Sequence, residues 1–277
     1  MTSAVRPHRL IVVAGTATEV GKTWVTARLV EELRRRRVTV AVRKPAQSYD
    51  PADHTTDADV LGAASAEAPE IVCPPHRWYP VPMAPPMASD VLDRGPVLID
   101  ELLNEVRDSW PGRAPDVGIV ELAGGVRSPM SHDADGVDLV ERLAPDLVVL
   151  VADAGLGTIN AVRLSAPPLV ELAPVVVVLN RFDGSDALHA ANLEWLSGEV
   201  SSLAPNVDTL LGAVLDILPA YCTGCGLPAG DCPGGCAPPL DPPRHCPRCG
   251  RRMAVTITPT GSTSRCRDHG ELGSPRD

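Results

Sequence analysis

The chain has 277 residues, of which 44% are hydrophobic, and a formal net charge of −10. That length accommodates one large domain with a small module, or two domains, and the apolar content is enough for a buried core. The acidic balance argues against broad nucleic-acid binding and against binding an anionic membrane, although a local basic site can still hold an anion. No apolar run is long enough to span a bilayer, and residues 1–10 lack a signal-peptide pattern. We therefore expect a cytoplasmic protein.

A short apolar strand predicted at 10–13 leads into a glycine-bounded loop and a helix predicted over 22–37. The loop reads Gly15-Thr-Ala-Thr-Glu-Val-Gly-Lys-Thr23. This is typical of a phosphate-binding loop, with one residue more than usual between the two glycines. Backbone N–H groups and the helix N-terminus attract phosphate, Lys22 adds a full charge, and Thr23 offers a hydroxyl to Mg²⁺.

Lysine usage points to a second residue of the same site. The chain has 25 basic residues, and all except Lys22 and Lys44 are arginine. Arginine substitutes poorly where a compact charge must enter a crowded phosphate site, so we predict a functional role for Lys44. It follows a strand predicted at 38–42, and open α/β sheets place ligand groups at the carboxyl ends of strands.

Two carboxylates are candidate magnesium ligands. Asp57 falls in the first turn of a helix predicted to begin at Thr55 or Thr56, where a carboxylate either reaches Mg²⁺ or only complements the helix dipole. Glu121 lies near the end of a strand predicted at 117–122 and is followed by Ala-Gly-Gly. A carboxylate at that position faces the phosphate loop and would hold Mg²⁺ or its water.

Strands and helices alternate through the rest of the first 219 residues. This pattern predicts a three-layer α/β domain of the P-loop NTPase type with a mostly parallel sheet. Asn180 ends one strand and either reads a nucleobase edge or caps the turn. The remaining predicted segments are a proline-dense surface loop at 73–86, helices at 97–110 and 186–196, and strands at 147–151, 175–179 and 209–214.

Seven of the eight cysteines fall between Cys222 and Cys266, which predicts a separate cysteine-rich module over 220–277. In a reducing compartment such a cluster favours metal ligands over disulfides. The second quartet flanks a hairpin predicted over 251–265 with a Pro-Thr-Gly turn, the plan of a zinc ribbon, whereas the first fits Zn²⁺ or an iron–sulfur cluster. The quartets are Cys222, Cys225, Cys232, Cys236 and Cys246, Cys249, Cys266, His269.

Four segments together resemble the ATP-dependent dethiobiotin synthetases of the biotin pathway. That family makes dethiobiotin from 7,8-diaminononanoate, CO₂ and MgATP, and acts as a homodimer. The longer phosphate loop is the family's own variant. The segments are Gly15 to Thr23, Lys44-Pro-Ala-Gln-Ser48, Glu121-Leu-Ala-Gly-Gly125 and Gly155-Leu-Gly-Thr-Ile-Asn160.

The resemblance implies a role for each matched residue. Lys22 and Lys44 would be catalytic, and Thr23, Asp57 and Glu121 would hold Mg²⁺. Thr18 and Ser48 would bind the diamine or its carbamate, and Asn160 would bind substrate near the partner subunit. The implied ATP contacts are Glu19, Val20, Gly21, Lys22, Thr23, Trp24, Asp57, Glu121, Leu122, Ala123, Gly124, Asn180, Leu215, Asp216 and Ile217.

Three positions depart from the family pattern. Leu122 replaces a glycine, so either the backbone approach near the carbamate changes or the side chain points away. Pro167-Pro168 interrupts a helix expected to face the dimer partner. Leu215 replaces a proline near the adenine.

The cysteine-rich module resembles the small actinobacterial biotin synthase auxiliary protein, through Tyr221-Cys-Thr-Gly-Cys and the segment that begins at Leu240. That resemblance implies contact with biotin synthase, and a purely structural zinc ribbon remains the alternative. For the whole chain the alternative function is a P-loop switch or partitioning ATPase with a structural ribbon. Such ATPases often carry a second lysine early in the loop, where this chain has Thr16-Ala17-Thr18.

Overall fold

The computed structural model describes residues 6–36, 38–112, 114–228, 231–236, 241–247, 249–258 and 261–272. The chain divides into two compact units between Ile217 and Leu218, close to the boundary predicted after residue 219. Within the described ranges, no helix combines the length and the apolar character that crossing a bilayer requires.

In the described part of the first unit, six strands form a parallel sheet in the order β2-β5-β1-β6-β7-β8. Parallel pairing brings the carboxyl ends of the strands to one edge, where the predicted site residues follow them. The strands are β1 (Arg9–Gly15), β2 (Val40–Arg43), β5 (Val117–Glu121), β6 (Leu147–Asp153), β7 (Val175–Asn180) and β8 (Leu203–Ala204).

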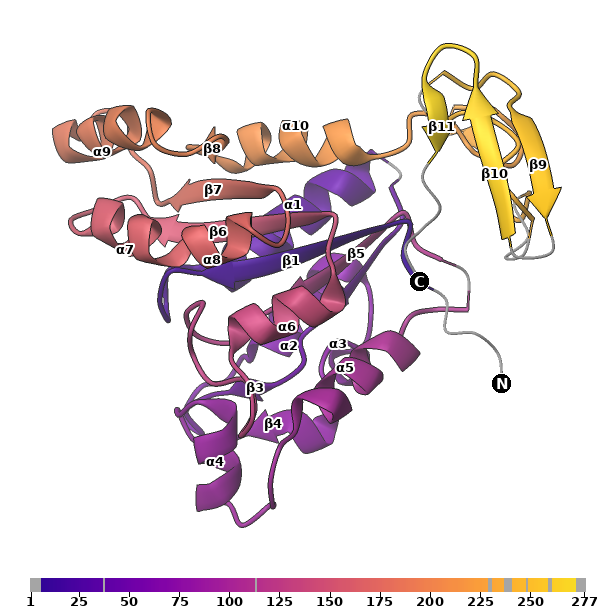
Figure 1. Ribbon diagram of the computed structural model, residues 1–277. Helices are drawn as coiled ribbons and strands as arrows, with labels where there is room; N and C mark the ends of the chain where they lie inside the picture. Colours follow the sequence, from indigo (N-terminus) through magenta and orange to yellow (C-terminus); the bar gives the residue numbers. More distant parts are fainter. Residues whose placement is uncertain are drawn as a thin grey trace. The chain divides into compact units, whose positions relative to one another are not determined.

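Helices cover both faces of this sheet (Figure 1). Strand residues are buried on both faces, as in β7, because each face is covered. Buried side chains of α5, α6 and α8 form one cluster with Leu10 and Val12 of β1, while α1 packs with α2 and α10. This arrangement is the predicted three-layer fold. The helices are α1 (Lys22–Arg35), α2 (Asp57–Ser65), α3 (Pro69–Val72), α4 (Pro85–Val91), α5 (Ile99–Asp108), α6 (Gly136–Leu143), α7 (Thr158–Ser165), α8 (Pro167–Val170), α9 (Ala187–Ser197) and α10 (Val207–Ile217).

The strand predicted at 209–214 was wrong, because this segment lies in α10. Leu210, Leu211 and Val214 are buried and follow the spacing of one helical face. The side-chain oxygen of Asn206 accepts a hydrogen bond from Thr209 N at 2.9 Å, which is typical of a helix start. The edge strand of the sheet is β8, which pairs with β7.

The helices α3, α4 and α6 were also not predicted. α4 begins inside the proline-dense segment, because Pro85 occupies the first turn, where a helix does not need the missing N–H. α6 begins with a reciprocal cap, in which the Asp135 carboxylate accepts from Asp138 N at 3.2 Å and the Asp138 carboxylate accepts from Asp135 N at 2.8 Å. The Pro167-Pro168 pair forms the first turn of α8, and α7 ends just before it.

In the second unit, the described residues form an antiparallel sheet in the order β11-β10-β9. The pair β9 (Ala254–Thr258) and β10 (Gly261–Cys266) is the predicted hairpin, and β11 (Gly270–Leu272) adds to β10. Pro259 and Thr260 of the predicted turn lie outside the described residues, as does Arg37 of the predicted first helix. The core cluster here consists of Cys246, Met253 and Cys266, so apolar burial alone is a small source of stability.

Candidate active site

The phosphate loop joins β1 to α1 in a tight curve. Gly21 has φ +88°, and a Cβ added there would lie 2.0 Å from Asn180 Nδ2, so glycine is required. Lys22 Nζ donates to the carbonyl of Ala17 at 3.1 Å, which folds this side chain back over the loop. Because α1 begins at Lys22, its unpaired N–H groups and positive dipole end face the loop. The loop therefore has the geometry of an anion site.

Four predicted residues meet at the carboxyl edge of the sheet. Lys44 Nζ lies 2.7 Å from Asp57 Oδ2 and 2.8 Å from Glu121 Oε1. Thr23 Oγ1 lies 2.9 Å from Asp57 Oδ1 and 2.7 Å from Glu121 Oε1. Lys44 is 2% exposed and Glu121 is fully buried, so these charges interact with little solvent screening.

The charges of this cluster set its ionisation. Burial acts to lower the pKa of Lys44, but Asp57 and Glu121 outweigh it and raise the pKa, so Lys44 stays charged. Burial acts to raise the pKa of Asp57, but the Lys44 charge outweighs it and lowers the pKa. Burial, together with repulsion from Lys44, lowers the pKa of Lys22 to about 8. The two lysines therefore hold their protons with very different strengths.

The oxygens of Thr23, Asp57 and Glu121 fit a magnesium ion. Mg²⁺ selects hard oxygen ligands and keeps several waters, so it needs only a few protein oxygens. One oxygen of each carboxylate lies within 2.9 Å of the Thr23 hydroxyl, which makes a compact set of oxygen donors. Thr26, which was not predicted, donates to the other oxygen of Glu121 at 2.7 Å and fixes that carboxylate.

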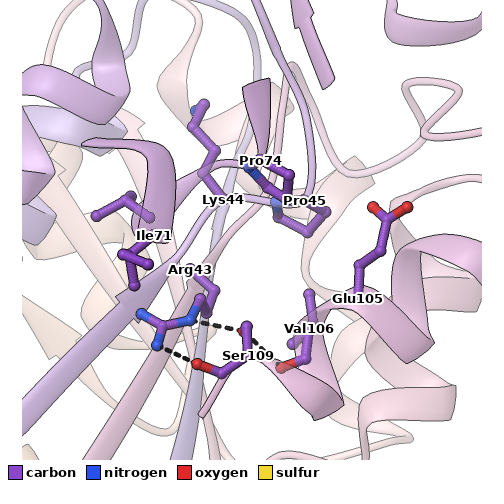
Figure 2. A pocket seen from close by; sticks show the side chains of 9 residues that line it. Arg43, Lys44, Pro45, Ile71, Pro74, Glu105, Val106 and Ser109 are labelled. Atoms are coloured by element: carbon purple, nitrogen blue, oxygen red, sulfur yellow. Dashed lines mark hydrogen bonds between the residues drawn. The ribbon is translucent and has the colours of Figure 1, made fainter. Parts of the chain in front are cut away.

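Arg43 and Lys44 are neighbours in sequence but point in different directions (Figure 2). Arg43 donates to Ser109 Oγ at 2.7 Å and pairs with Glu67 at 2.8 Å, so it anchors β2. Arg43, Lys44 and Val106 line a cavity of about 10 Å³, which has room for one water molecule at most. Of this pair, only Lys44 contacts Asp57 and Glu121, the carboxylates that also bind Thr23 of the phosphate loop.

The segment after β5 lies against the phosphate loop. A Cβ added at Gly124 would lie 3.9 Å from Thr18 Oγ1, so Thr18 faces this segment. The Leu122 side chain is 1% exposed and belongs to the core cluster, so it points away from the site. The second alternative for Leu122 therefore holds.

Two buried hydroxyls, Ser48 Oγ and Thr158 Oγ1, have no hydrogen-bond partner among the described residues. Ser48 belongs to the short strand β3 (Gln47–Ser48), which pairs with β4 (Trp78–Tyr79). Thr158 begins α7 and lies two residues before Asn160, which is exposed. Unpaired buried polar atoms are costly, and a bound ligand or an ordered water would satisfy each of them. Thr158 was not predicted, although it lies within the matched glycine-rich segment.

Asn180 fastens the phosphate loop. Its Nδ2 donates to Val20 O at 2.9 Å, so the side-chain amide is held against the loop. Arg181 reinforces the same contact, with Nη2 donating to Glu19 O at 3.0 Å and Nη1 pairing with Asp153 at 2.7 Å. Arg181 and Asp153 were not predicted.

Leu215, Asp216 and Ile217 are not beside the phosphate loop, which corrects their prediction as adenine contacts. Ile217 ends α10, and its carbonyl accepts from Arg9 Nε at 2.7 Å, at the amino end of β1. The phosphate loop follows the carboxyl end of β1, about 20 Å away for a strand of this length. Trp24 is 55% exposed in the first turn of α1 and remains beside the loop.

The second unit brings together the two predicted ligand quartets. In each, the ligand atoms lie within 4.8 Å of one another, so either could hold a metal. In the first, Cys222 Sγ and Cys232 Sγ lie 3.2 and 3.1 Å from Cys236 Sγ. In the second, His269 Nδ1 lies 3.5 Å from Cys246 Sγ.

A family model described as an AAA domain matches residues 9–210 and leaves the cysteine-rich unit outside the match. Among solved structures, a putative plasmid partition protein from Borrelia burgdorferi aligns with a TM-score of 0.48 and 12% identity. That alignment covers 76% of this chain and 99% of the other, a likeness too low to carry an argument about function.

Curated relatives carry the closer likeness. An ATP-dependent dethiobiotin synthetase from Haloferax mediterranei is 36% identical over 67% of this chain and 79% of its own length. The same-named proteins of Caulobacter vibrioides and Corynebacterium efficiens are 34% and 31% identical over 67% and 76% of this chain, and 84% and 92% of their own lengths. With the phosphate loop, Lys44 and the two carboxylates gathered at one edge of the sheet, the chain belongs to the family of ATP-dependent dethiobiotin synthetases, which are ligases.

Proposed function

We propose that the first unit makes dethiobiotin from 7,8-diaminononanoate, CO₂ and MgATP, and releases ADP and phosphate. The observation that carries this proposal is the buried ammonium of Lys44 between Asp57 and Glu121, beside Thr23. A fixed cation here suits a reaction in which negative charge passes between a phosphoryl group and a carbamate. A nucleotide switch, which transfers no phosphoryl group to a carbamate, does not need a cation at this point.

The reaction divides into three steps. One amine adds to CO₂ and loses a proton, which gives a carbamate. A carbamate oxygen attacks the γ-phosphorus, and the bond to the β–γ bridging oxygen breaks to release ADP. The second amine attacks the carbonyl of the mixed anhydride and loses a proton, and phosphate leaves as the ring closes. Mg²⁺ held by Thr23, Asp57 and Glu121 would neutralise phosphate charge during the transfer.

The chain's own residues bind and position the reactants. Lys22 and the N–H groups from Glu19 to Thr23 bind the phosphates, while Lys44 stabilises the charge of the phosphoryl group in transfer. Thr18 and Ser48 hydrogen-bond the diamine or carbamate, and the unpaired Ser48 hydroxyl supports this role. Asn180 contacts adenine through its side-chain amide.

A homodimer completes the site, with Asn160 binding substrate near the partner subunit. Three exposed apolar side chains lie near Asn160 in the sequence: Leu156 is 92%, Leu164 71% and Val170 57% exposed. Exposed apolar surface of this kind is typical of a protein interface. The unpaired hydroxyl of Thr158 lies in the same segment and supports a ligand there.

The test is incorporation of labelled bicarbonate into dethiobiotin by the full chain, with the diamine and MgATP. Label in dethiobiotin, with one ADP formed per ring, supports the proposal. ATP hydrolysis without labelled product would favour the switch ATPase instead.

We propose that the second unit binds metal and assists biotin synthase, the enzyme that inserts sulfur into dethiobiotin. The two ligand quartets and the resemblance around Tyr221 support this assignment. Sulfur insertion would be assayed with the full chain and with a Cys225→Ser variant. No stimulation by the full chain would leave only the structural ribbon, and equal stimulation by both chains would show that the first quartet is not needed for the assistance.

A further inference from the structure

The second unit contains two copies of one metal-binding turn. The first knuckle is 221–228, and the second is 245–247 with 249–252. In the first, Gly226 N donates to Cys222 O at 2.9 Å and Cys222 N to Leu227 O at 2.8 Å. In the second, Gly250 N donates to Cys246 O at 2.8 Å and Cys246 N to Arg251 O at 2.8 Å. The equivalent glycines have φ of +75° and +69°.

The two knuckles contact each other reciprocally. Tyr221 N donates to Pro247 O at 2.9 Å, and the equivalent His245 N donates to Thr223 O at 2.8 Å. Each acceptor directly follows the first cysteine of its knuckle. The backbone that shapes one metal site is therefore held by the backbone that shapes the other.

The glycines make this contact close. A Cβ added at Gly226 would lie 2.7 Å from Gly250 O, and a Cβ added at Gly250 would lie 2.7 Å from Gly226 O. Any side chain at either position would push the knuckles apart. The close packing of the two knuckles therefore requires glycine at both positions.

The size of each quartet selects a single ion. A zinc ion with Zn–S bonds near 2.3 Å places its ligands about 3.8 Å apart. The Sγ atoms of Cys225 and Cys232 in the first quartet, and of Cys249 and Cys266 in the second, lie 3.8 Å apart. Cys236 Sγ lies closer still, 3.2 Å from Cys222 Sγ and 3.1 Å from Cys232 Sγ. In a four-iron cluster the cysteines bind different irons, so their sulfurs lie further apart than the 4.8 Å limit found here.

We infer that each quartet takes one tetrahedral ion of the Zn²⁺ class and that the two ions bind cooperatively. The small core leaves the metal bonds as the main stabilisation of this unit, so filling one quartet orders its knuckle. An ordered knuckle holds its carbonyl, Thr223 O or Pro247 O, in place to accept a hydrogen bond from the other knuckle, which favours metal binding there. By thermodynamic linkage, this coupling is the same in both directions. The inference rests on the metal binding proposed above and is independent of the synthetase reaction.

The first test titrates Zn²⁺ into the reduced, metal-free full chain and counts ions per chain by native mass spectrometry. Chains with zero and two ions should dominate, with one-ion chains at about a tenth of the total or less. Dominant one-ion chains at half saturation would overturn the coupling but leave metal binding intact. No bound zinc, or a sulfide-containing cluster after anaerobic reconstitution with iron, would overturn the assignment of the ions as well.

A matched pair of variants tests the route of coupling. Gly250→Ala adds both left-handed strain and the clash with Gly226, whereas Gly270→Ala adds strain at φ +76° with nothing within 4 Å. Cd²⁺-loaded chains distinguish the two quartets by cadmium NMR, because one has four sulfurs and the other three sulfurs and a nitrogen. Gly250→Ala should raise the fraction of one-ion chains at half saturation about threefold or more, because it breaks the contact that couples the two knuckles. Gly270→Ala should weaken the His269 quartet but leave the one-ion fraction near that of the native chain. An unchanged one-ion fraction in Gly250→Ala would overturn the route.

Discussion

Lys22 and Lys44 lie in one site but have different surroundings. Lys44 contacts two carboxylates directly, whereas the closest polar partner of Lys22 is the carbonyl of Ala17. Lys44 is therefore a permanent charge held at a fixed point. A guanidinium is wider than an ammonium and cannot occupy that buried point without displacing Asp57 or Glu121.

Lys44→Arg should retain nucleotide binding and lose about 100-fold in turnover, because the charge remains but its position relative to the transferring phosphoryl group changes. Dethiobiotin formation and equilibrium binding of MgATP would be measured on the same preparation. Arg28→Lys, at an exposed position of α1, is the control. Full turnover in Lys44→Arg would rule out the proposed role.

The local sequence revealed only part of this site. Lys44 could be predicted because only two of the 25 basic residues are lysine, and Thr23 because it belongs to a recognisable loop. Thr26 and Arg181 gave no such signal. Their partners, Glu121 and Glu19, are 95 and 162 residues away along the chain, so only the folded sheet brings them together.

At the scale of elements, α2 determines where Asp57 lies. Its first residue is Asp57, and its start is fixed by a reciprocal cap. Thr56 Oγ1 accepts from Asp59 N at 3.3 Å, and the Asp59 carboxylate accepts from Thr56 N at 2.8 Å. The carboxylate that Lys44 needs is thus positioned by two residues that never touch it.

Thr56→Ala should destabilise the first unit by about 1 kcal/mol, because it removes a helix cap. The four tryptophans all lie in this unit, so their fluorescence in urea reports its unfolding without interference from the second unit. Thr55→Ala, at the neighbouring exposed position, is the control and should change little. Equal stability of both variants would show that the cap is not needed.

His132 links three segments of the first unit. Its Nε2 lies 3.0 Å from Asp90 of α4, and Val97 N donates to its Nδ1 at 2.9 Å. The contact with Asp90 raises the pKa of His132 above 6.5. A raised pKa in the folded state adds stability that is present below pH 6.5 and is lost as pH rises through the folded pKa.

Asp90→Asn should therefore lower the pKa of His132 toward 6.5 and weaken the first unit at pH 6 more than at pH 9. Ring-proton NMR follows the titration of His132, and urea unfolding at the two pH values gives the stability. A stability loss that is the same at both pH values would argue against an ionic contact.

The segment 209–214 is an apolar run that predicts a strand, but it lies in α10, and Leu210, Leu211 and Val214 have helical spacing. That prediction placed the carboxyl end of the last strand at 215–217. β8 ends at Ala204, so Pro205 and Asn206 are the residues that follow it at the edge where nucleotide binds. Long buried strands were easier to predict, because their apolar runs have no competing helical pattern.

At the scale of the whole molecule, the proposed catalytic groups all come from the first unit. The phosphate loop, Lys44, Asp57 and Glu121 precede Ile217, and each contact that joins them lies within that unit. The second unit has its own sheet and its own ligand quartets. Synthesis of the ring should therefore not require it.

A chain cut after Pro219 should make dethiobiotin within about twofold of the full chain, because domains with separate cores fold independently. Turnover and tryptophan-detected unfolding would be compared for both chains. Loss of turnover without loss of stability would show that the second unit contributes to catalysis.

The bond between Arg9 Nε and Ile217 O fixes where the first unit ends, at the amino end of β1. The phosphate loop follows the other end of the same strand, after Gly15. The covalent link to residue 218 therefore leaves the first unit at the edge of the sheet opposite the phosphate loop. Lengthening or shortening that link should leave the contacts of Lys44 with Asp57 and Glu121 unchanged.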